Sequence, residues 1–276
     1  MQGEASSLPS DRVTIEIADG VAEVTLNRPD KLNALDPTMF EAIIAAGERL
    51  SRTKGLRAVV LVGAGKGFCA GLDKASFAAM AGGSAGQHFA DIVARTHGIA
   101  NAWQQATCVW RALPVPVIAA IHGVAFGGGF QIALGADIRC VAPDARLAIM
   151  EIKWGLVPDM GGIALMRELA RSDVIRELAM TGRVFSGEEA LTYGFATSLH
   201  ADPLAAARLT ASEIAARSPH AVRAVKRLLN ASADADTSAI LLVESKEQAT
   251  LLASPNQIEA VRAGMEGRPG RFVDSE

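Results

Sequence analysis

The stretch VPVIAAIHGVAFGGGFQIALGAD, residues 115–137, shows the organisation that decides the fold. Its apolar run 115–121 has the length and composition of a buried strand, and the glycine-rich segment 123–129 leads from this strand into a short helix. An earlier stretch, AVVLVGAGKGFCAGLD (58–73), has the same arrangement, with a strand at 58–62 that runs into a glycine-bearing loop. Buried strands that alternate with helices are typical of an α/β core with parallel strand pairing.

Turn and cap signals predict further elements on both sides of these stretches. Alternating apolar and polar residues at 13–18 and 21–26 flank Asp19-Gly20, which predicts a β-hairpin. Asp36-Pro37 supplies an N-cap followed by proline in the first turn, so we expect a helix that continues through Arg49. The pattern also predicts a helix over 89–112 and a strand over 137–142.

The C-terminal part of the chain has a different pattern. From Met160 onward the sequence predicts helix after helix, interrupted at Thr181-Gly182 and by the short apolar segment 195–200. We therefore divide the chain into a flexible tail (1–11), a mixed α/β core that carries the site (12–200) and a C-terminal helical region (201–276). The glycine-rich segment 82–86 is expected to form a flexible loop at the border of a binding cleft.

Composition and charge argue against several classes of protein. Half of the 276 residues are hydrophobic and 21% are charged, which is enough material for a large core. The net charge of −3 and the pI near 6.0 argue against a nucleic-acid-binding protein. Cys69, Cys108 and Cys140 show no metal-like spacing, so we expect reduced thiols. Because the sequence shows no signal-peptide pattern and no apolar run near the ~18 residues of a membrane span, we expect a cytoplasmic protein without a membrane partner.

Two glycine-rich loops have the pattern of sites that bring backbone N–H groups to a ligand. They lie within 63–73 and 122–137, each directly after a predicted strand. Glycine lets the backbone approach a bound group, and a loop that opens a helix adds the positive end of the helix dipole. Two such loops that converge would form an oxyanion hole for a carbonyl oxygen. Each loop alone is equally compatible with a structural turn, and neither has the spacing of a P-loop or a dinucleotide-binding loop.

A third segment, MEIKWGLVPDMGG (150–162), carries two carboxylates. Glu151 has apolar neighbours in sequence, and burial favours the protonated form of a carboxyl, which suits proton transfer near neutral pH. Asp159 follows before Gly161-Gly162. Structural alternatives stay open at this point: Glu151 as a paired core carboxylate or a solvated strand residue, and Asp159 as the N-cap of a helix that begins near Met160.

Five motifs resemble those of one enzyme family. Their order and spacing in this chain are similar to those of motifs in the crotonase, or enoyl-CoA hydratase/isomerase, superfamily. The five motifs are NRPDKLNALD (27–36), FCAGLD (68–73), GVAFGGGFQIALGADIR (123–139), EIKWGLVPDMGG (151–162) and TGRVFSGEEALTYGF (181–195). The resemblance extends from about residue 12 to residue 272. It implies a crotonase-like spiral of ββα turns over 12–200 and a C-terminal helical trimerisation region over 201–276. It also implies a homotrimer or a dimer of trimers that acts on an acyl-CoA thioester, with CoA as part of the substrate and no metal or other cofactor.

The resemblance also implies which residues bind the CoA thioester. Ala70 and Lys74 match the stretch that holds the adenine end of CoA, and Leu72 lies between them in the same loop. Lys66 stands where members of the family often have a phosphate-contacting lysine, and Arg28 is predicted to have the same role. The backbone N–H groups of Leu72 and of Gly128 match the oxyanion-hole donors of the family.

The chain departs from the hydratases of this family at one catalytic position. Those hydratases carry two glutamates that hold and activate one water; here the second is Glu151 and the first position is occupied by Gln131. An amide cannot take or give a proton as a carboxylate can. Single-glutamate members resemble enoyl-CoA isomerases, and the spacing of Glu151 and Asp159 resembles that of dienoyl-CoA isomerases, although those have an Asp at the position of Gln131.

We therefore expect an enzyme that shifts a double bond of an enoyl- or dienoyl-CoA. Glu151 and Asp159 would exchange protons with the acyl chain, while Gln131 would orient substrate or a water without ionising. The alternatives are an enoyl-CoA hydratase of low efficiency and a CoA-binding member without this chemistry. An RNA-binding role, known for one branch of the superfamily, calls for a longer basic helix than the runs 54–57 and 223–227 provide.

Overall fold

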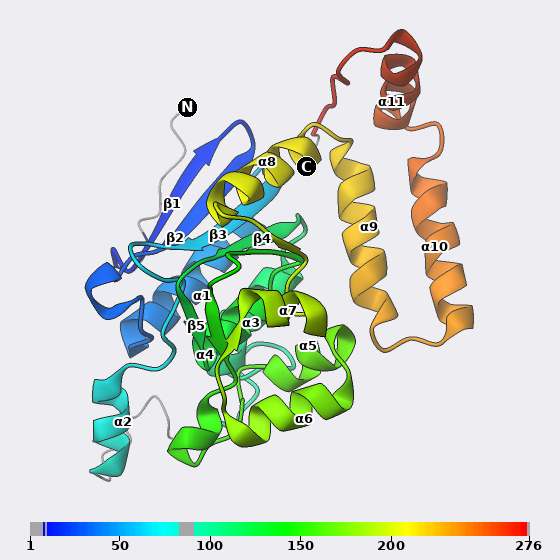
Figure 1. Ribbon diagram of the computed structural model, residues 1–276. Helices are drawn as coiled ribbons and strands as arrows, with labels where there is room; N and C mark the ends of the chain where they lie inside the picture. The colour runs from blue at the N-terminus through cyan, green and yellow to red at the C-terminus, as the bar shows by residue number, and fades with distance from the viewer. Residues whose placement is uncertain (1–7, 9, 83–90, 275–276) are drawn as a thin grey trace.

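The computed structural model in Figure 1 describes residues 8, 10–82 and 91–274. Most of the predicted tail 1–11 and most of the predicted loop 82–86 lie outside the described residues. The elements in chain order are β1 (Val13–Ala18), β2 (Val21–Leu26), η1 (Pro29–Lys31), α1 (Pro37–Ser51), β3 (Ala58–Gly63), α2 (Lys74–Ala81), α3 (Ala102–Ala112), β4 (Val117–Ile121), β5 (Val124–Phe126), α4 (Gly128–Leu134), β6 (Ile138–Val141), β7 (Arg146–Ala148), η3 (Glu151–Trp154), α5 (Gly162–Leu169), α6 (Ser172–Thr181), β8 (Phe185–Ser186), α7 (Gly187–Tyr193), β9 (Ser198–Leu199), α8 (Pro203–Ala215), α9 (Pro219–Ser232), α10 (Thr237–Leu251) and α11 (Pro255–Glu266).

The strands form two sheets, and the chain passes repeatedly from one to the other. The larger sheet has the order β1-β2-β3-β4-β6-β9 and the smaller one the order β5-β7-β8. The pairs β2·β3, β3·β4, β4·β6 and β6·β9 are parallel, as the sequence predicted. After β4 the chain enters the small sheet as β5, forms α4, returns to the large sheet as β6 and enters the small sheet again as β7. This alternation is the predicted spiral of ββα turns.

Helices cover both faces of the large sheet. Residues of β3 alternate between the two sides: Val59 and Leu61 pack in the larger core cluster, whereas Val60 and Val62 pack in a second cluster with Ala207 of α8. Figure 1 shows α8 lying across this second face. Because both faces are buried, β3 is a continuous apolar run instead of an alternating one.

The predicted hairpin and first helix are confirmed. Asp19 and Gly20 both have positive φ (51° and 78°), which is the backbone of a tight hairpin turn, and they join β1 to β2. Asp36 caps α1, since its Oδ1 accepts a hydrogen bond from Met39 N at 2.8 Å.

The predicted helix over 89–112 is wrong over 91–101, and residues 89 and 90 lie outside the described part of the chain. Helix α3 begins only at Ala102, where Asn101 and Gln104 form a reciprocal capping box. Before it, Gly98 has a φ of +64°, and side chains bond to the main chain in place of helical partners: Arg95 donates to the carbonyl of Val93 and Asn101 to that of Ile92. The glycine-rich segment 123–129 also differs from the expected loop, because 124–126 pairs with β7 as strand β5.

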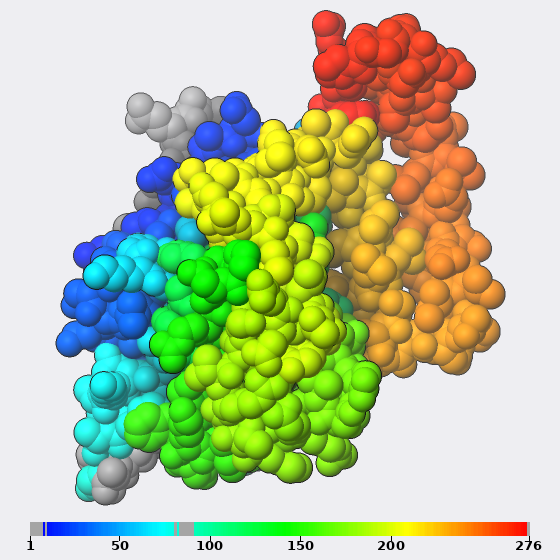
Figure 2. Space-filling model, in the orientation of Figure 1, coloured from blue at the N-terminus to red at the C-terminus, as the bar shows by residue number. Residues whose placement is uncertain are grey.

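The C-terminal helices extend beside the body of the molecule (Figures 1 and 2). Helix α9 is anchored by two buried cations that the sequence offers as a basic run. Lys226 Nζ donates to the carbonyls of Trp110 and Val115 and to Asp137, and Arg223 pairs with Asp274. Within the described residues, no helix is both long and apolar enough to cross a membrane. The domain boundaries and the trimerisation role of residues 201–276 stay predictions.

Candidate active site

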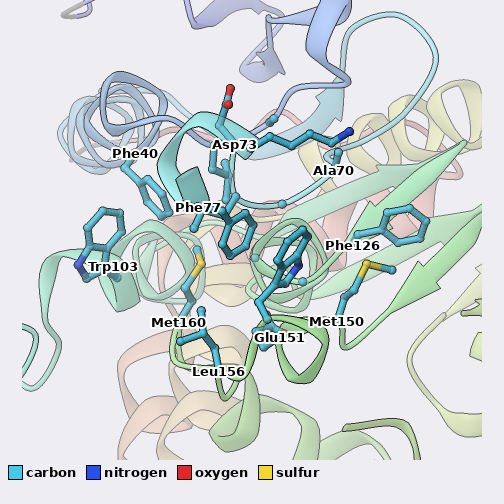
Figure 3. Close-up of a pocket in the computed structure, with 18 of the residues that line it drawn as sticks. Phe40, Ala70, Asp73, Phe77, Trp103, Phe126, Met150, Glu151, Leu156 and Met160 are labelled. Carbon is cyan, nitrogen blue, oxygen red and sulfur yellow. The ribbon is translucent and has the colours of Figure 1, made fainter. Parts of the chain in front are cut away.

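A cavity of about 700 Å³ lies where the two glycine loops meet the segment after β7. Figure 3 shows Phe40 and Trp103 on one side of this cavity, Phe126 and Met150 on the other, and Glu151 between them. The lining residues are mostly apolar, and their charged members are Asp30, Lys31, Asp73, Lys74, Glu151 and Asp159. An apolar pocket with a few converging polar groups has the composition of a small-molecule site.

One wall of the cavity is made by main chain; it consists of Gly71, Leu72, Gly127 and Gly128 and is called the backbone wall below. Leu35 N donates to the carbonyl of Gly71 at 2.8 Å, and Asp73 N donates to the carbonyl of Leu35 at 2.9 Å. These two hydrogen bonds use the carbonyl of Gly71 and the N–H of Asp73, on either side of Leu72. The N–H of Leu72 itself has no acceptor among the described residues. The loop is therefore fixed while one donor remains available.

The second donor of the backbone wall comes from the start of α4. Gly128 is the first residue of this helix, and first-turn N–H groups have no partner within a helix. A Cβ at Gly71 would lie 2.5 Å from the carbonyl oxygen of Phe126 and 3.5 Å from Gly128 N, so the two loops approach each other as closely as glycine allows. The structure thus brings Leu72 and Gly128 to one wall of the cavity, and their role as oxyanion-hole donors stays a prediction.

A second part of the lining carries the two carboxylates, Glu151 and Asp159, and is called the carboxylate wall below. Glu151 opens η3 and its Oε1 accepts a hydrogen bond from Gln131 Nε2 at 2.6 Å. The other oxygen, Oε2, is buried and has no hydrogen-bond partner within the described part of the chain. The carboxylate also lies close to the cavity's backbone wall, since a Cβ at Gly127 would be 3.3 Å from Oε1.

Both carboxyl groups have raised pKa values. Desolvation by burial raises the pKa of Glu151, and the charge of Asp159 raises it further, while the hydrogen bond from Gln131 acts in the opposite direction. Desolvation also raises the pKa of Asp159, which lines the same cavity and is an exposed residue. Carboxyls in this state are suited to proton exchange near neutral pH.

The structural alternatives for the two carboxylates can now be compared with their surroundings. Glu151 is neither a solvated strand residue nor part of a core ion pair, because it begins a 3₁₀ helix and accepts a hydrogen bond from a neutral amide. Asp159 is not a helix N-cap: α5 begins at Gly162, and its N-cap residue Gly161 has no side chain. Both carboxylates face the cavity instead.

Gln131 differs from the role that the sequence suggested. It is 1% exposed, and it is not among the described residues that line the cavity. Its Oε1 accepts hydrogen bonds from Met160 N at 2.9 Å and from Gly162 N at 3.0 Å. The amide is therefore occupied on both sides by protein groups, and its direct contact in the site is with Glu151.

The candidate CoA-binding residues separate into two groups. Ala70, Leu72 and Lys74 line the cavity, whereas Lys66 is exposed and is not among the described lining residues. Arg28 is largely buried and pairs with Asp73 and, at 3.5 Å, with Asp36. The structure thus gives Arg28 two carboxylate partners within the chain, and phosphate contacts by Arg28 or Lys66 stay predictions.

Sequence reasoning missed the aromatic residues of the site. Phe40 and Trp103 pack edge to face, with ring centroids 4.3 Å apart, and Phe77 stacks on Trp154 at 4.1 Å. Phe40 and Trp103 belong to α1 and α3, where helical spacing predicts only core positions. Trp154 lies three residues after Glu151, and this proximity is the signal in the sequence that could have linked an aromatic residue to the site.

Comparisons with known proteins point to one enzyme family. The chain matches the model of the enoyl-CoA hydratase/isomerase family over residues 16–274. Human mitochondrial Delta(3,5)-Delta(2,4)-dienoyl-CoA isomerase is 32% identical over 257 residues, which cover 92% of this chain and 78% of that protein. Mouse mitochondrial methylglutaconyl-CoA hydratase is 29% identical over 260 residues, which cover 92% of this chain and 79% of that protein. The crystal structure of an enoyl-CoA hydratase from Bacillus anthracis superposes with a TM-score of 0.84 at 27% identity, covering 96% of this chain and 100% of the other.

Proposed function

Since this chain belongs to the enoyl-CoA hydratase/isomerase family, we propose that it moves a carbon–carbon double bond along the acyl chain of an enoyl- or dienoyl-CoA. Glu151 and Asp159 transfer the protons, and the N–H groups of Leu72 and Gly128 bind the thioester carbonyl oxygen. The single observation that carries the proposal is the carboxylate wall: two carboxyls with raised pKa values face one cavity, and the position of a hydratase's other glutamate holds the buried amide of Gln131.

The proposed reaction consists of two proton transfers. With a 3-enoyl-CoA, Glu151 takes the proton on the carbon next to the thioester carbonyl, and the electron pair delocalises onto the carbonyl oxygen as a dienolate. The N–H groups of Leu72 and Gly128 stabilise that oxyanion. A proton from Glu151 or Asp159 then returns to the far carbon of the former double bond, which gives the conjugated 2-enoyl-CoA. No atom is gained or lost, so the reaction needs no water and no redox cofactor.

The charged and the apolar residues that line the cavity would bind different parts of the substrate. The charged lining residues Lys74 and Lys31 suit the phosphates of CoA, and the apolar residues Phe40, Trp103 and Met160 suit an uncharged acyl chain. We propose that the acyl group is a hydrocarbon chain, and that CoA enters only as part of the substrate.

An absorbance assay on three thioesters tests the proposal. A 3-enoyl-CoA and a 3,5-dienoyl-CoA should develop the ultraviolet absorbance of a conjugated enoyl thioester, with products of unchanged mass. A 2-enoyl-CoA should lose its absorbance at least tenfold more slowly. If the 2-enoyl-CoA is instead consumed fastest, to a product one water heavier, the isomerase proposal is wrong.

Deuterium exchange separates the roles of the two carboxylates. In D₂O the Asp159→Asn variant should lose about tenfold of its conjugation activity, less than the usual cost of about 10² to 10⁴ for one acid/base group. It should still exchange the proton next to the carbonyl, because Glu151 remains. If Asp159→Asn loses both this exchange and isomerisation, while Glu151→Gln keeps the exchange, the two roles are reversed.

The alternative function is a hydratase of low efficiency, because the relatives include hydratases at similar identity. Glu151 and Asp159 would then share one water. Tight binding of a CoA thioester without turnover of any of the three would favour a CoA-binding member instead. A trimer or dimer of trimers and a cytoplasmic location also belong to the proposal; several relatives are mitochondrial.

A further inference from the structure

We propose that Gln131 is a positioning residue that fixes both acid/base carboxylates at once and selects Oε2 of Glu151 as the oxygen that carries the exchanged proton. The inference rests on the proposed function and assigns this chain's own glutamine a role that involves no contact with substrate. It depends on three hydrogen bonds made by one buried amide.

The orientation of the amide is determined by its neighbours. Met160 N and Gly162 N are donors, so only the carbonyl oxygen of Gln131 can face them, at 2.9 and 3.0 Å. The NH₂ group must then point to Glu151 Oε1, at 2.6 Å. Close packing leaves little freedom to reorient, since a Cβ at Gly162 would lie 2.6 Å from the Oε1 of Gln131.

Each end of the amide acts on one carboxylate. The donor on Oε1 of Glu151 occupies that oxygen, so a proton on this carboxyl resides on Oε2, which has no other partner among the described residues. The acceptor holds the N–H of Met160, the residue directly after Asp159, and so fixes the backbone that carries the second carboxyl group. One side chain thereby sets the distance between the two proton-transfer groups.

The charged residues of η3 and α6 near Glu151 are exposed or paired elsewhere. Asp159 is the charged neighbour that raises its pKa. Lys153 on η3 is exposed, and α4, which carries Gln131, has no charged residue. Helix α6 packs on η3, and its charged residues are Asp173, paired with Arg171, Glu177, paired with Arg183, and the exposed Arg176.

The test compares Gln131→Glu with the matched control Gln248→Glu, the same change at an exposed position of α10. At position 131 the new carboxylate keeps an acceptor for Met160 N and Gly162 N, so we expect a folded protein. Its other oxygen lies against Oε1 of Glu151, and two carboxylates at that distance share a proton and release the last one at higher pH. We expect the acid limb of the kcat/KM profile to move up by at least one pH unit, with activity at neutral pH at least tenfold lower and KM within threefold. Gln248→Glu should match the wild type.

Carbon-13 NMR of the glutamate carboxyls provides a readout that does not depend on turnover, with the Glu151 signal assigned by its loss in Glu151→Gln. In Gln131→Glu the titration of Glu151 should move upward, and in Gln131→Met, which removes the donor, it should also move upward. An unchanged Glu151 titration in both variants, or a loss of activity that is uniform across pH, would overturn the inference. A shifted titration in a protein that turns over none of the thioesters would reject the proposed function and leave the Gln131–Glu151 coupling established.

Discussion

The two walls of the cavity obtain fixed geometry by different means. The backbone wall is held by main-chain hydrogen bonds and by glycines in conformations that other residues avoid, with φ of +80° at Gly71 and +50° at Gly127. The carboxylate wall is held by side chains, with the amide of Gln131 between Glu151 and the backbone of Met160. The difference teaches where each wall tolerates change: Gly71 has no room for a Cβ, which would lie 2.5 Å from a main-chain carbonyl oxygen, whereas conservative side-chain changes are expected to retune the carboxylate wall without unfolding it.

The largest expected effect is on the carboxylate wall. Glu151→Gln should lower turnover of a 3-enoyl-CoA by about 10² to 10⁴, the usual cost of removing a positioned acid/base group. The new amide can still accept the hydrogen bond from Gln131, so the dissociation constant for the CoA thioester, measured by calorimetry, should stay within tenfold. Wild-type turnover in the folded variant would mean that Glu151 is structural and that another group carries the proton.

Gly71→Ala addresses the backbone wall. Its Cβ would meet the carbonyl of Phe126 at 2.5 Å, so the loop must move and displace the N–H of Leu72. We expect kcat to fall by about 10² to 10³, the cost of losing one oxyanion donor. The matched control is Gly55→Ala, which has a similar φ of +74° and no atom within 4 Å of the added carbon. Equal kcat values for the two variants would show that backbone strain, and not the contact, causes any loss.

A smaller effect is expected on the stability of the protein, and for Glu151 of the carboxylate wall it should depend on pH. Burial raises the pKa of Glu151 above its ordinary 4.5, so its contribution to stability is full below that pH and is lost as pH rises through the folded-state pKa. Glu151→Gln removes this loss, and its melting temperature should exceed that of the wild type by a few degrees near neutral pH and match it near pH 4. Glu213→Gln, an exposed control on α8, should show no such difference. A variant less stable than wild type at both pH values would contradict this reading.

The smallest effect is expected at the cavity's charged lining. Lys74 is exposed, and a single solvated cation contributes about 0.2–1 kcal/mol to an ionic contact. Lys74→Ala should therefore raise KM for a CoA thioester by no more than about fivefold and leave kcat unchanged, and the increase should shrink at high salt. Lys246→Ala on α10 is the control. A drop in kcat would place Lys74 in the chemistry instead of in CoA binding.

Local sequence signals predicted the elements on which the site is built. Asp19-Gly20 requires the hairpin, Asp36-Pro37 starts α1, and glycines at 71 and 127–129 mark where backbone approaches backbone. Each of these depends on residues within a few positions of one another. The start of the helix expected over 89–112 was wrong. Apolar residues continue upstream of it, but the capping box of Asn101 and Gln104 starts the helix at Ala102.

The sequence by itself determined the α/β class, the two glycine loops and the two carboxylates of the segment 150–162. Only the tertiary structure decided which groups Gln131 contacts, because its partners Glu151, Met160 and Gly162 are 20 to 31 residues away in the chain. The same holds for Arg28, whose charge is paired with Asp73 across 45 residues, and for Phe40 and Trp103, which helical spacing describes only as core. Local backbone preferences are readable from neighbouring residues, whereas the partner of a buried polar or aromatic side chain depends on which distant segments the fold brings together.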